Sequence, residues 1–401
     1  MNRPISRRAL LRLIAVSSLS AVLPACVPAP LAPTPSPAPT HTASPQPTLP
    51  QETATMQPTP IALLPESSRA LKELKNLQTV ARLVGEGAIN DTPGLWGVYG
   101  TDLGSLFDKD GRLYMVFGDT FGCCIPGSGG PGSAGDWRSN VMAVITDRDP
   151  RDGLTFEEMI TDRPGHAKQL LAKGSGDVTV IPTYGVAVDQ RMYLHYMAVK
   201  VWGAPGRWTL NASGLAYSDD DGHTWVKDEG ARWAGDSNFG QAALVKSGDD
   251  LYMFGIPGGR YGEVCLARAP QADLLNKSAY RYFSGMRDGA PQWSPEEQTA
   301  APIVPAPVGE LSVLWNAYLQ RWIMTYLDTP QYALMLREAP DLWGPWSPAL
   351  TLARGAQYPG LYGAYMHPWL VEEDGRIVYF TMSQWGPYAV FLMKVELEKK
   401  A

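Results

Sequence analysis

In the stretch YGVAVDQRMYLHYM (Tyr184–Met197), two apolar strands flank the turn Asp189-Gln190. Asp, Asn and Gly tolerate the backbone angles of tight turns, and branched and aromatic residues favour strands, so this stretch predicts a β-hairpin. The pattern occurs four more times, at residues 103–117, 241–254, 311–327 and 366–382. The second strands of the five hairpins are centred near Val116, Tyr196, Met253, Thr325 and Phe380, at steps of 80, 57, 72 and 55 residues.

Repetition at this spacing leaves room for two further strands per unit and predicts an all-β, five-bladed β-propeller over residues 66–401. A β-sandwich is the alternative, but it does not require five similar hairpins. A short amphipathic helix is expected at the start, over Glu66–Leu77, because three leucines recur there at helical spacing. The run SDDDGHTW (Ser218–Trp225) matches the Asp-box turn of sialidases and other propellers. Its three aspartates are therefore expected to shape a turn rather than to form a catalytic or metal cluster.

The composition excludes several classes of protein. The chain has 401 residues, 45% of them hydrophobic and 18% charged, as expected for a protein with a substantial core. With 34 basic and 40 acidic residues the net charge is −6, which argues against nucleic-acid binding. Four cysteines are too few for a disulfide scaffold. Metal and nucleotide motifs are absent from the sequence, so no cofactor is expected to be required, although a central structural ion remains an option.

The N-terminal segment predicts export. A basic run (Ser6–Arg12) precedes an apolar stretch (Leu13–Leu23) that is too short to span a membrane, so residues 1–25 are interpreted as a cleaved signal. The Arg pair resembles a twin-arginine signal, and the run LPAC ending at Cys26 resembles a lipobox, with an ordinary secretory signal as the alternative. Residues 26–65, rich in Pro and Thr, predict a disordered linker. We therefore expect a monomeric, extracytoplasmic lipoprotein, anchored to the membrane through Cys26.

Carboxylates at the starts of the innermost strands are the candidate catalytic groups, because a propeller gathers these starts around its axis. Asp102 and Glu310 occupy such positions, and Asp119 ends an otherwise apolar strand. Buried carboxylates cost free energy unless they are paired or used, and glycoside hydrolysis needs two of them, one ionised and one protonated. The structural alternative is that Asp119 caps a turn and that Glu310 pairs with an arginine such as Arg138 or Arg337.

Polar and aromatic residues near the same strand starts are candidates for binding a sugar substrate. They are Tyr99, Trp137, Arg138, Asn140, Asn238, Gln241, Tyr365 and His367. Trp96, Trp202 and Trp208 are further aromatic candidates for stacking on sugar rings. His367 is also a candidate for holding a central ion, whereas His195 is expected to be an interior residue with its hydrogen bonds satisfied.

Four motifs resemble a bacterial family catalogued as a domain of unknown function, whose members are assigned as endo-D-arabinanases. They are YGTDLG (99–104), FGDTF (117–121), WRSN (137–140) and GELSV (309–313). The resemblance covers about residues 79–396 and places the chain with the five-bladed β-fructosidase and arabinanase propellers. It implies a hydrolase that cleaves furanosidic linkages in D-arabinan-type polysaccharide. Asp102 would be the base or nucleophile, and Asp119 or Glu310 the acid.

The chain departs from related arabinanases in two places, because blade two offers no clear carboxylate and blade three offers Asn238 and Gln241 instead of an acidic residue. A carbohydrate-binding propeller without catalysis is the main alternative. A sialidase-like enzyme is a weaker one, since the strand starts do not supply three arginines and a nucleophilic tyrosine. The hydrolase hypothesis requires Asp102 and Glu310 to meet at one end of the axis. It also requires that neither is buried in a salt bridge away from solvent.

Overall fold

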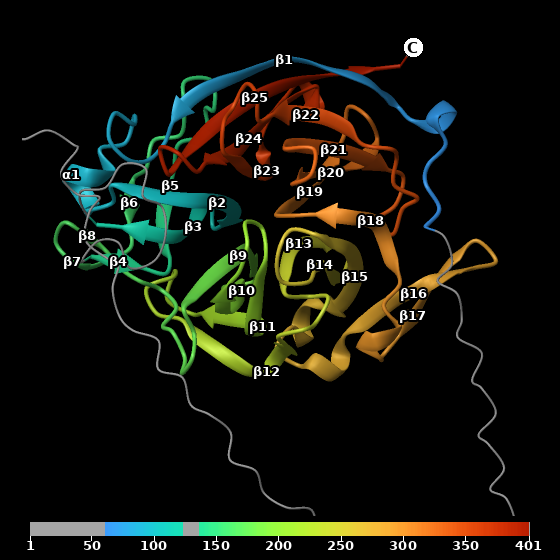
Figure 1. The fold of residues 1–401 in the computed structure, drawn as a ribbon, viewed down its shortest axis with the longest axis horizontal. Helices are drawn as coiled ribbons and strands as arrows, with labels where there is room; N and C mark the ends of the chain where they lie inside the picture. Colours follow the sequence, from blue (N-terminus) through green and yellow to red (C-terminus); the bar gives the residue numbers. More distant parts are fainter. Residues whose placement is uncertain (1–60, 123–135, 401) are drawn as a thin grey trace, which may run out of the picture. The chain divides into compact units, whose positions relative to one another are not determined.

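The computed structural model describes residues 61–122 and 136–400, which form five antiparallel sheets around a common centre (Figure 1). Each predicted hairpin supplies the two innermost strands of one sheet. The innermost strands β2, β9, β13, β19 and β23 contact one another in a closed ring. The five-bladed propeller is therefore confirmed, and the sandwich alternative is wrong.

The blades follow one another along the chain. Blade one contains β2 (Gly100–Lys109), β3 (Arg112–Phe121), β5 (Val141–Ile145) and β6 (Glu158–Met159), with β4 (Trp137–Arg138) also paired to β3. A separate small sheet follows, made of β7 (Thr161–Arg163) and β8 (His166–Ala167). Blade two contains β9 (Thr179–Val188), β10 (Arg191–Trp202), β11 (Trp208–Ser218) and β12 (Val226–Ala234).

Blade three is the largest sheet and carries an outer extension. It contains β13 (Gln241–Ser247), β14 (Asp250–Ile256), β15 (Gly262–Pro270), β16 (Arg281–Arg287) and β17 (Ala290–Ser294), with β18 (Pro302–Val308) paired to β15. Blade four contains β19 (Leu311–Asn316), β20 (Arg321–Asp328), β21 (Ala333–Ala339) and β22 (Leu350–Arg354).

Blade five joins the two ends of the propeller. It contains β23 (Leu361–Glu372), β24 (Ile377–Gln384), β25 (Ala389–Lys399) and, as its outermost strand, β1 (Leu71–Arg82). The helices are α1 (Thr92–Trp96) and 3₁₀ turns at Glu66–Ser68, Gln271–Asp273, Lys277–Ala279, Glu297–Thr299 and Glu373–Gly375. None of the helices in the described part of the chain is both long and apolar enough to cross a membrane.

The helix expected over Glu66–Leu77 is wrong. After one 3₁₀ turn these residues enter β1, which lies along β25 (blue beside red in Figure 1). Three register shifts interrupt the pairing of β1 with β25. Each shift offsets the alternation of side chains by one residue, so the leucines recur at a spacing that resembles a helix.

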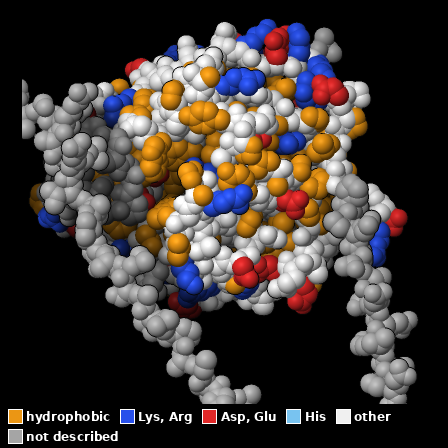
Figure 2. All heavy atoms as spheres, viewed as in Figure 1, with side chains coloured by type: hydrophobic (Ala, Val, Ile, Leu, Met, Phe, Trp, Pro, Cys, Tyr) orange, Lys and Arg blue, Asp and Glu red, His pale blue; other side chains and the backbone are white. Residues whose placement is uncertain are grey.

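The core lies between neighbouring blades, where the faces of adjacent sheets meet. Phe107, Met142 and Leu194 belong to one cluster that joins blades one and two. Phe117 and Leu392 belong to another that joins blades one and five. On the face shown in Figure 2, apolar side chains extend over the middle, and charges of both signs are scattered among them and at the rim. The described residues of that face thus form no broad patch of one charge.

The turn between β11 and β12 is held by the side chains that the sequence singles out. Asp220 accepts hydrogen bonds from the Thr224 amide at 2.8 Å and from the Ser218 hydroxyl at 2.8 Å. The Trp225 indole donates to the Gly222 carbonyl at 2.9 Å. These contacts of Asp220 are internal to the turn, whereas Asp219 pairs with Arg191 of β10 and Asp221 with Lys109 of β2.

Several expectations concern residues outside the described ranges. They are the signal at residues 1–25, the lipidated Cys26, and most of the linker at 26–65. At the end of that linker, the Leu64 amide donates to the Trp346 carbonyl of blade four at 2.9 Å. Residues 61–65 therefore lie against the propeller.

Candidate active site

The candidate carboxylates converge at one end of the propeller axis, the end at which the five inner strands begin; we call it the site end. Asp102 is the third residue of β2, Glu310 directly precedes β19, and Asp119 lies near the end of β3, which pairs with the start of β2. The three charges act on one another, since Glu310 raises the pKa of Asp102 and Asp102 raises the pKa of Asp119. The sequence therefore identified groups that meet in space.

An irregularity in β2 aims the Asp102 side chain. The pairing of β2 with β3 shifts register on both sides of Leu103, which has a φ of 67°, and Gly104 follows with a φ of 81°. A side chain on the facing Gly118 would place its Cβ 2.4 Å from Asp102 Oδ1. Bulges of this kind are common beside active sites, where they redirect a side chain. Gly118 is thus explained by the close approach of the two strands, and Gly104 by its positive φ.

The Asp102 carboxyl group is held in a largely apolar setting and yet remains partly exposed. Its Oδ2 accepts a hydrogen bond from the Tyr362 hydroxyl at 2.9 Å, while its buried Oδ1 has no hydrogen-bond partner among the described residues. Burial raises the pKa of Asp102 to about 7, and the hydroxyls of Tyr362 and Tyr388 partly offset this effect. The group is therefore ionised above about pH 7, and the ionised carboxylate is the form that acts as a general base or nucleophile.

Asp119 is more deeply enclosed, with 4% of its surface exposed. Its Oδ1 accepts a hydrogen bond from the Thr179 hydroxyl at 2.6 Å. Burial, followed by repulsion from Asp102, raises the pKa of Asp119 well above its ordinary value. A protonated carboxyl group beside a second carboxylate is the arrangement that general-acid catalysis needs.

Glu310 forms an ion pair with Arg260, which lies in the loop between β14 and β15. Its Oε1 accepts from Nη2 at 2.6 Å and from Nε at 2.8 Å. Under the structural alternative, Glu310 is expected to pair with Arg138 or Arg337. That prediction of the partner is wrong, because Glu310 pairs with Arg260. The pair is not sealed from solvent, because 22% of the Arg260 side chain and 6% of Glu310 are exposed. Glu310 is near enough to Asp102 to raise its pKa, as the hypothesis requires. Because Glu310 is bound in a salt bridge to Arg260, it suits a supporting role rather than proton donation.

Two of the predicted substrate-binding residues line a narrow cavity on the axis together with Glu310. Tyr365 is almost fully buried, and its ring lies 6.2 Å from that of Tyr184. The Gln241 amide donates to the Gly259 carbonyl at 2.7 Å and so holds the loop that carries Arg260.

Three other predicted residues are found at the rim of the site end. Trp137 is half-buried, and Lys173 lies 4.7 Å above its ring. Tyr99 and Asn238 are exposed.

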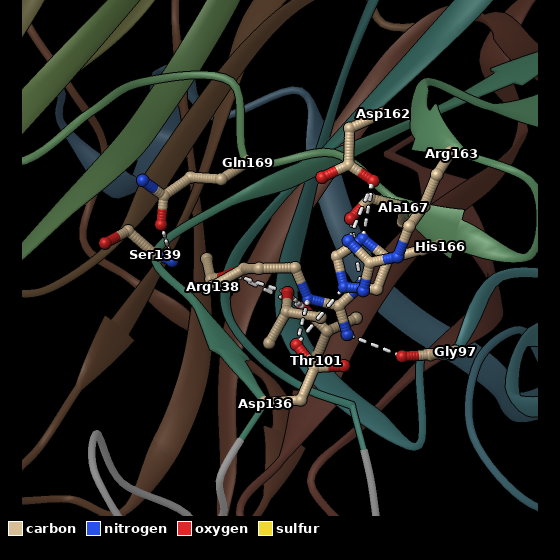
Figure 3. A network of polar contacts seen from close by, with 12 residues as sticks. Gly97, Thr101, Asp136, Arg138, Ser139, Asp162, Arg163, His166, Ala167 and Gln169 are labelled. Carbon is tan, nitrogen blue, oxygen red and sulfur yellow. Dashed lines mark hydrogen bonds and ion pairs between the residues drawn. The ribbon is translucent and has the colours of Figure 1, made fainter.

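Arg138 occupies a structural position rather than the expected substrate contact (Figure 3). Its guanidinium donates to the carbonyls of Ala167, at 2.9 Å, and Gly97, and lies 3.6 Å from Asp136. His166 bridges Asp136 and Asp162 in the same network. These contacts fasten β4 to β8 and leave Arg138 only 4% exposed.

Asn140 and His367 also differ from expectation. The Asn140 amide donates to the carbonyls of Leu171 and Val180 and accepts from two backbone amides, so its hydrogen bonds are already satisfied. His367 lies toward the opposite end of the axis, where its Nε2 contacts Asp108 at 3.2 Å. It is too far along β23 to join the carboxylates at the site end. His195, as expected, is an interior residue, bonded to Thr183 and the Phe239 carbonyl.

Sequence reasoning missed Arg260, Tyr362, Tyr388 and Thr179. Tyr362 is the second residue of β23, so a better estimate of where that strand begins would have selected it together with Tyr365. Arg260 lies in a loop and is brought to Glu310 by tertiary structure alone. Among residues 61–122 and 136–400, no group of three or more His, Cys, Asp or Glu is arranged to hold a metal ion.

Comparison with known proteins gives both a family and a fold. The profile described as "Domain of unknown function (DUF4185)" matches residues 87–394. The chain is 28% identical over 346 residues to Notoamide biosynthesis cluster protein J of Aspergillus sp. (strain MF297-2), covering 80% of this chain and 88% of that protein.

Two solved structures are similar to the propeller. A protein from Bacteroides ovatus ATCC 8483 superposes with a TM-score of 0.53 at 15% identity, covering 75% of this chain and 86% of that chain. An exo-β-1,3-galactanase from Phanerochaete chrysosporium gives a TM-score of 0.48 at 10% identity, covering 79% and 64%. The similarity to the Bacteroides ovatus protein is a similarity of the propeller fold.

Proposed function

Since the chain belongs to the DUF4185 family, a domain of unknown function, we propose its activity from the site itself: hydrolysis of furanosidic linkages in a D-arabinan-type polysaccharide. One observation carries the proposal. Two carboxyl groups, the half-buried Asp102 and the buried Asp119, lie at the same end of the axis, and their surroundings raise both pKa values, that of Asp119 well above its ordinary value. Glycoside hydrolases typically use two carboxyl groups. The surroundings keep one group protonated, as the general acid, and the other ionised, as the base or nucleophile.

The two groups supply complementary steps. Asp119, whose raised pKa favours the protonated form, would donate its proton to the glycosidic oxygen as the bond to the anomeric carbon breaks. Asp102, ionised above about pH 7, would either take a proton from the attacking water or attack the anomeric carbon itself. In the second case, a water activated by Asp119 would release the sugar, and Asp119 would recover its proton.

The Glu310–Arg260 pair adjusts the charge of Asp102 without taking part in proton transfer. Glu310 raises the pKa of Asp102, whereas Arg260 lowers it. Because the guanidinium also lies 4.9 Å above the Tyr362 ring, it fixes the tyrosine whose hydroxyl orients Asp102. The pair is therefore a positioning element for the reacting carboxylate.

The substrate class rests on the family resemblance of the carboxylate motifs. The expected export signal and lipid anchor at Cys26 would bring such a site to a cell-wall polymer, and lipid labelling that is lost in Cys26→Ser would check this. A binding propeller without catalysis is the second candidate, favoured by the commitment of Glu310 to a salt bridge.

The test is release of reducing sugar from D-arabinan, with L-arabinan, fructan and galactan beside it. Asp102→Asn and Asp119→Asn are each expected to lose about 10³-fold in kcat/KM. The matched control is Asp108→Asn, the same substitution at the other end of β2, where the aspartate contacts His367. It should stay within about threefold of the wild type.

Misfolding can be separated from loss of chemistry. Because burial raises the pKa of Asp102 from 3.8 to about 7, the free energy of unfolding falls as the pH rises from about 4, where the unfolded group ionises, to about 7, where the folded group ionises, and the loss persists above that pH. A neutral asparagine removes that loss, so Asp102→Asn should be at least as stable as the wild type at pH 8. Full activity of Asp102→Asn would end the hydrolase proposal, and arabinan binding without any cleavage would support the lectin alternative.

A further inference from the structure

A hollow of about 440 Å³ opens beside the carboxylates, between the loop joining β10 to β11 and the loop joining β14 to β15. Its walls are aromatic rings and glycine backbone: Trp208 and Tyr261 contribute rings, and Gly206, Gly258 and Gly259 contribute main chain. A ring face next to exposed backbone donors and acceptors suits a sugar, which has an apolar C–H face and a rim of hydroxyls.

Exposed apolar side chains lie in the hollow, at Val201, and beside it, at Trp202. Val201 is 53% exposed, and Trp202 is 38% exposed and packs edge-to-face on Trp208 with ring centres 5.4 Å apart. The Trp208 indole nitrogen is buried without a hydrogen-bond partner among the described residues. Arg207 lies over the Tyr261 ring at 4.1 Å, which fixes the far wall.

The glycines keep the hollow open. A Cβ on Gly258 would lie 3.1 Å from the Trp208 carbonyl, and one on Gly206 would lie 3.1 Å from the Tyr261 ring. Gly259 has a φ of 95°, a conformation that other residues rarely adopt. A side chain at any of these positions would narrow the space in front of Trp208.

One loop connects the hollow to the reacting groups. Gly259 and Tyr261 line the hollow, and Arg260 between them turns inward to Glu310 while lying 5.5 Å from the Trp208 ring. A chain bound across the carboxylates would therefore meet the aromatic rings next.

We propose that this hollow is a binding subsite for additional sugar residues of the same polysaccharide, extending the bound chain from the carboxylates over blades two and three. The inference rests on the proposed function and deepens it. The enzyme recognises several consecutive residues, and Trp202 and Trp208 provide the stacking platform away from the cleaved bond.

The test compares two tryptophans in similar surroundings. Trp202→Ala removes the ring that lies beside the hollow and packs on Trp208, which lines it. The matched control is Trp315→Ala, because Trp315 is 40% exposed and packs edge-to-face on Trp322 at 5.3 Å, but lies at the far end of β19 from Glu310. Trp202→Ala should raise KM for polymeric arabinan about tenfold, with kcat changed less than threefold. On the shortest cleaved oligosaccharide KM should change less than twofold, and Trp315→Ala should match the wild type on both.

A binding measurement separates the two proposals. In an Asp102→Asn background, arabinan should retard the protein in an affinity gel, and adding Trp202→Ala should weaken that retardation about tenfold, whereas Trp315→Ala should not. If the wild type cleaves arabinan and Trp202→Ala behaves as Trp315→Ala does, the subsite is wrong and the hydrolase stands. If no polymer is cleaved but retardation depends on Trp202, the hydrolase is wrong and the sugar site stands. Absence of both cleavage and retardation overturns both.

Discussion

Asp102 lies where β2 departs from regular pairing, with Tyr362 on one carboxylate oxygen and Gly118 against the other. This placement gives a carboxyl group that is enclosed enough to have its pKa raised to about 7, yet partly open to solvent. The residues that set the pKa and the exposure of Asp102 come from blades one, three, four and five. At the scale of one residue, the chemistry depends on neighbours that are distant in sequence.

The pH dependence of activity follows from these contacts. Since Asp102 must be ionised to act, kcat/KM should fall as the pH drops below about 7. The Tyr362 hydroxyl stabilises the charged form, so Tyr362→Phe should raise the pKa of Asp102 and move the acidic limb of the profile upward by roughly one to two pH units. A pH–rate series on arabinan measures this shift.

A suitable control is Tyr184→Phe, because the Tyr184 hydroxyl contacts Ser312 and not Asp102. It should leave the acidic limb in place. An unshifted limb in Tyr362→Phe would show that another group controls the acidic side of the profile.

At the scale of one element, β1 shows how the propeller is closed. It pairs with β25 of blade five, while its first amides are held by blade four. The buried Glu338 of β21 accepts hydrogen bonds from the Leu71 amide at 2.8 Å and from the Ala70 amide at 2.5 Å. Glu398 of β25, whose side chain is 31% exposed, pairs with the exposed Lys72 of the same strand β1. Two glutamates thus contact β1, one in the core and one at the surface.

These two glutamates should differ in their effect on stability. Glu338→Gln places an amide NH₂ against a backbone N–H in a buried site, and should lower the free energy of unfolding by roughly 3 kcal/mol. Glu398→Gln removes a surface ion pair and should cost less than about 1 kcal/mol. Urea titrations of both variants measure the difference. Equal midpoints would mean that Glu338 does not hold β1 in place.

At the scale of the whole molecule, a strand from the beginning of the propeller and strands from its end form one sheet (Figure 1). The site depends on this closure, since Asp102 from the first blade meets Tyr362 from the last. If the ring opened between blades one and five, the base would lose its hydrogen-bond donor. Stability and activity should therefore be lost together.

A disulfide across the closing strands tests this dependence. Gln78 and Lys394 face each other in the pairing of β1 with β25. The Gln78→Cys, Lys394→Cys double variant, once oxidised, should gain about 3 kcal/mol over its reduced form because the bond spans almost the whole propeller. Thermal unfolding with and without reductant measures the gain, and the two single-cysteine variants control for the native thiols. No gain on oxidation would place the weak point of the ring elsewhere.

The sequence by itself determined the five hairpins, their order around the ring and the position of Asp102, Asp119 and Glu310 at one end of the axis, because strand alternation and turn residues are local and a repeated unit must close on itself. The prediction of a helix in the segment that forms β1 was wrong, because register shifts in this strand place its leucines at a spacing that resembles a helix. Only the tertiary structure decided that Arg260 neutralises Glu310, that Tyr362 holds Asp102, and that Arg138, Asn140 and His367 serve the fold. These outcomes depend on burial and on distances between separate blades, which set the protonation of a carboxyl group and have no counterpart in the spacing of residues along the chain.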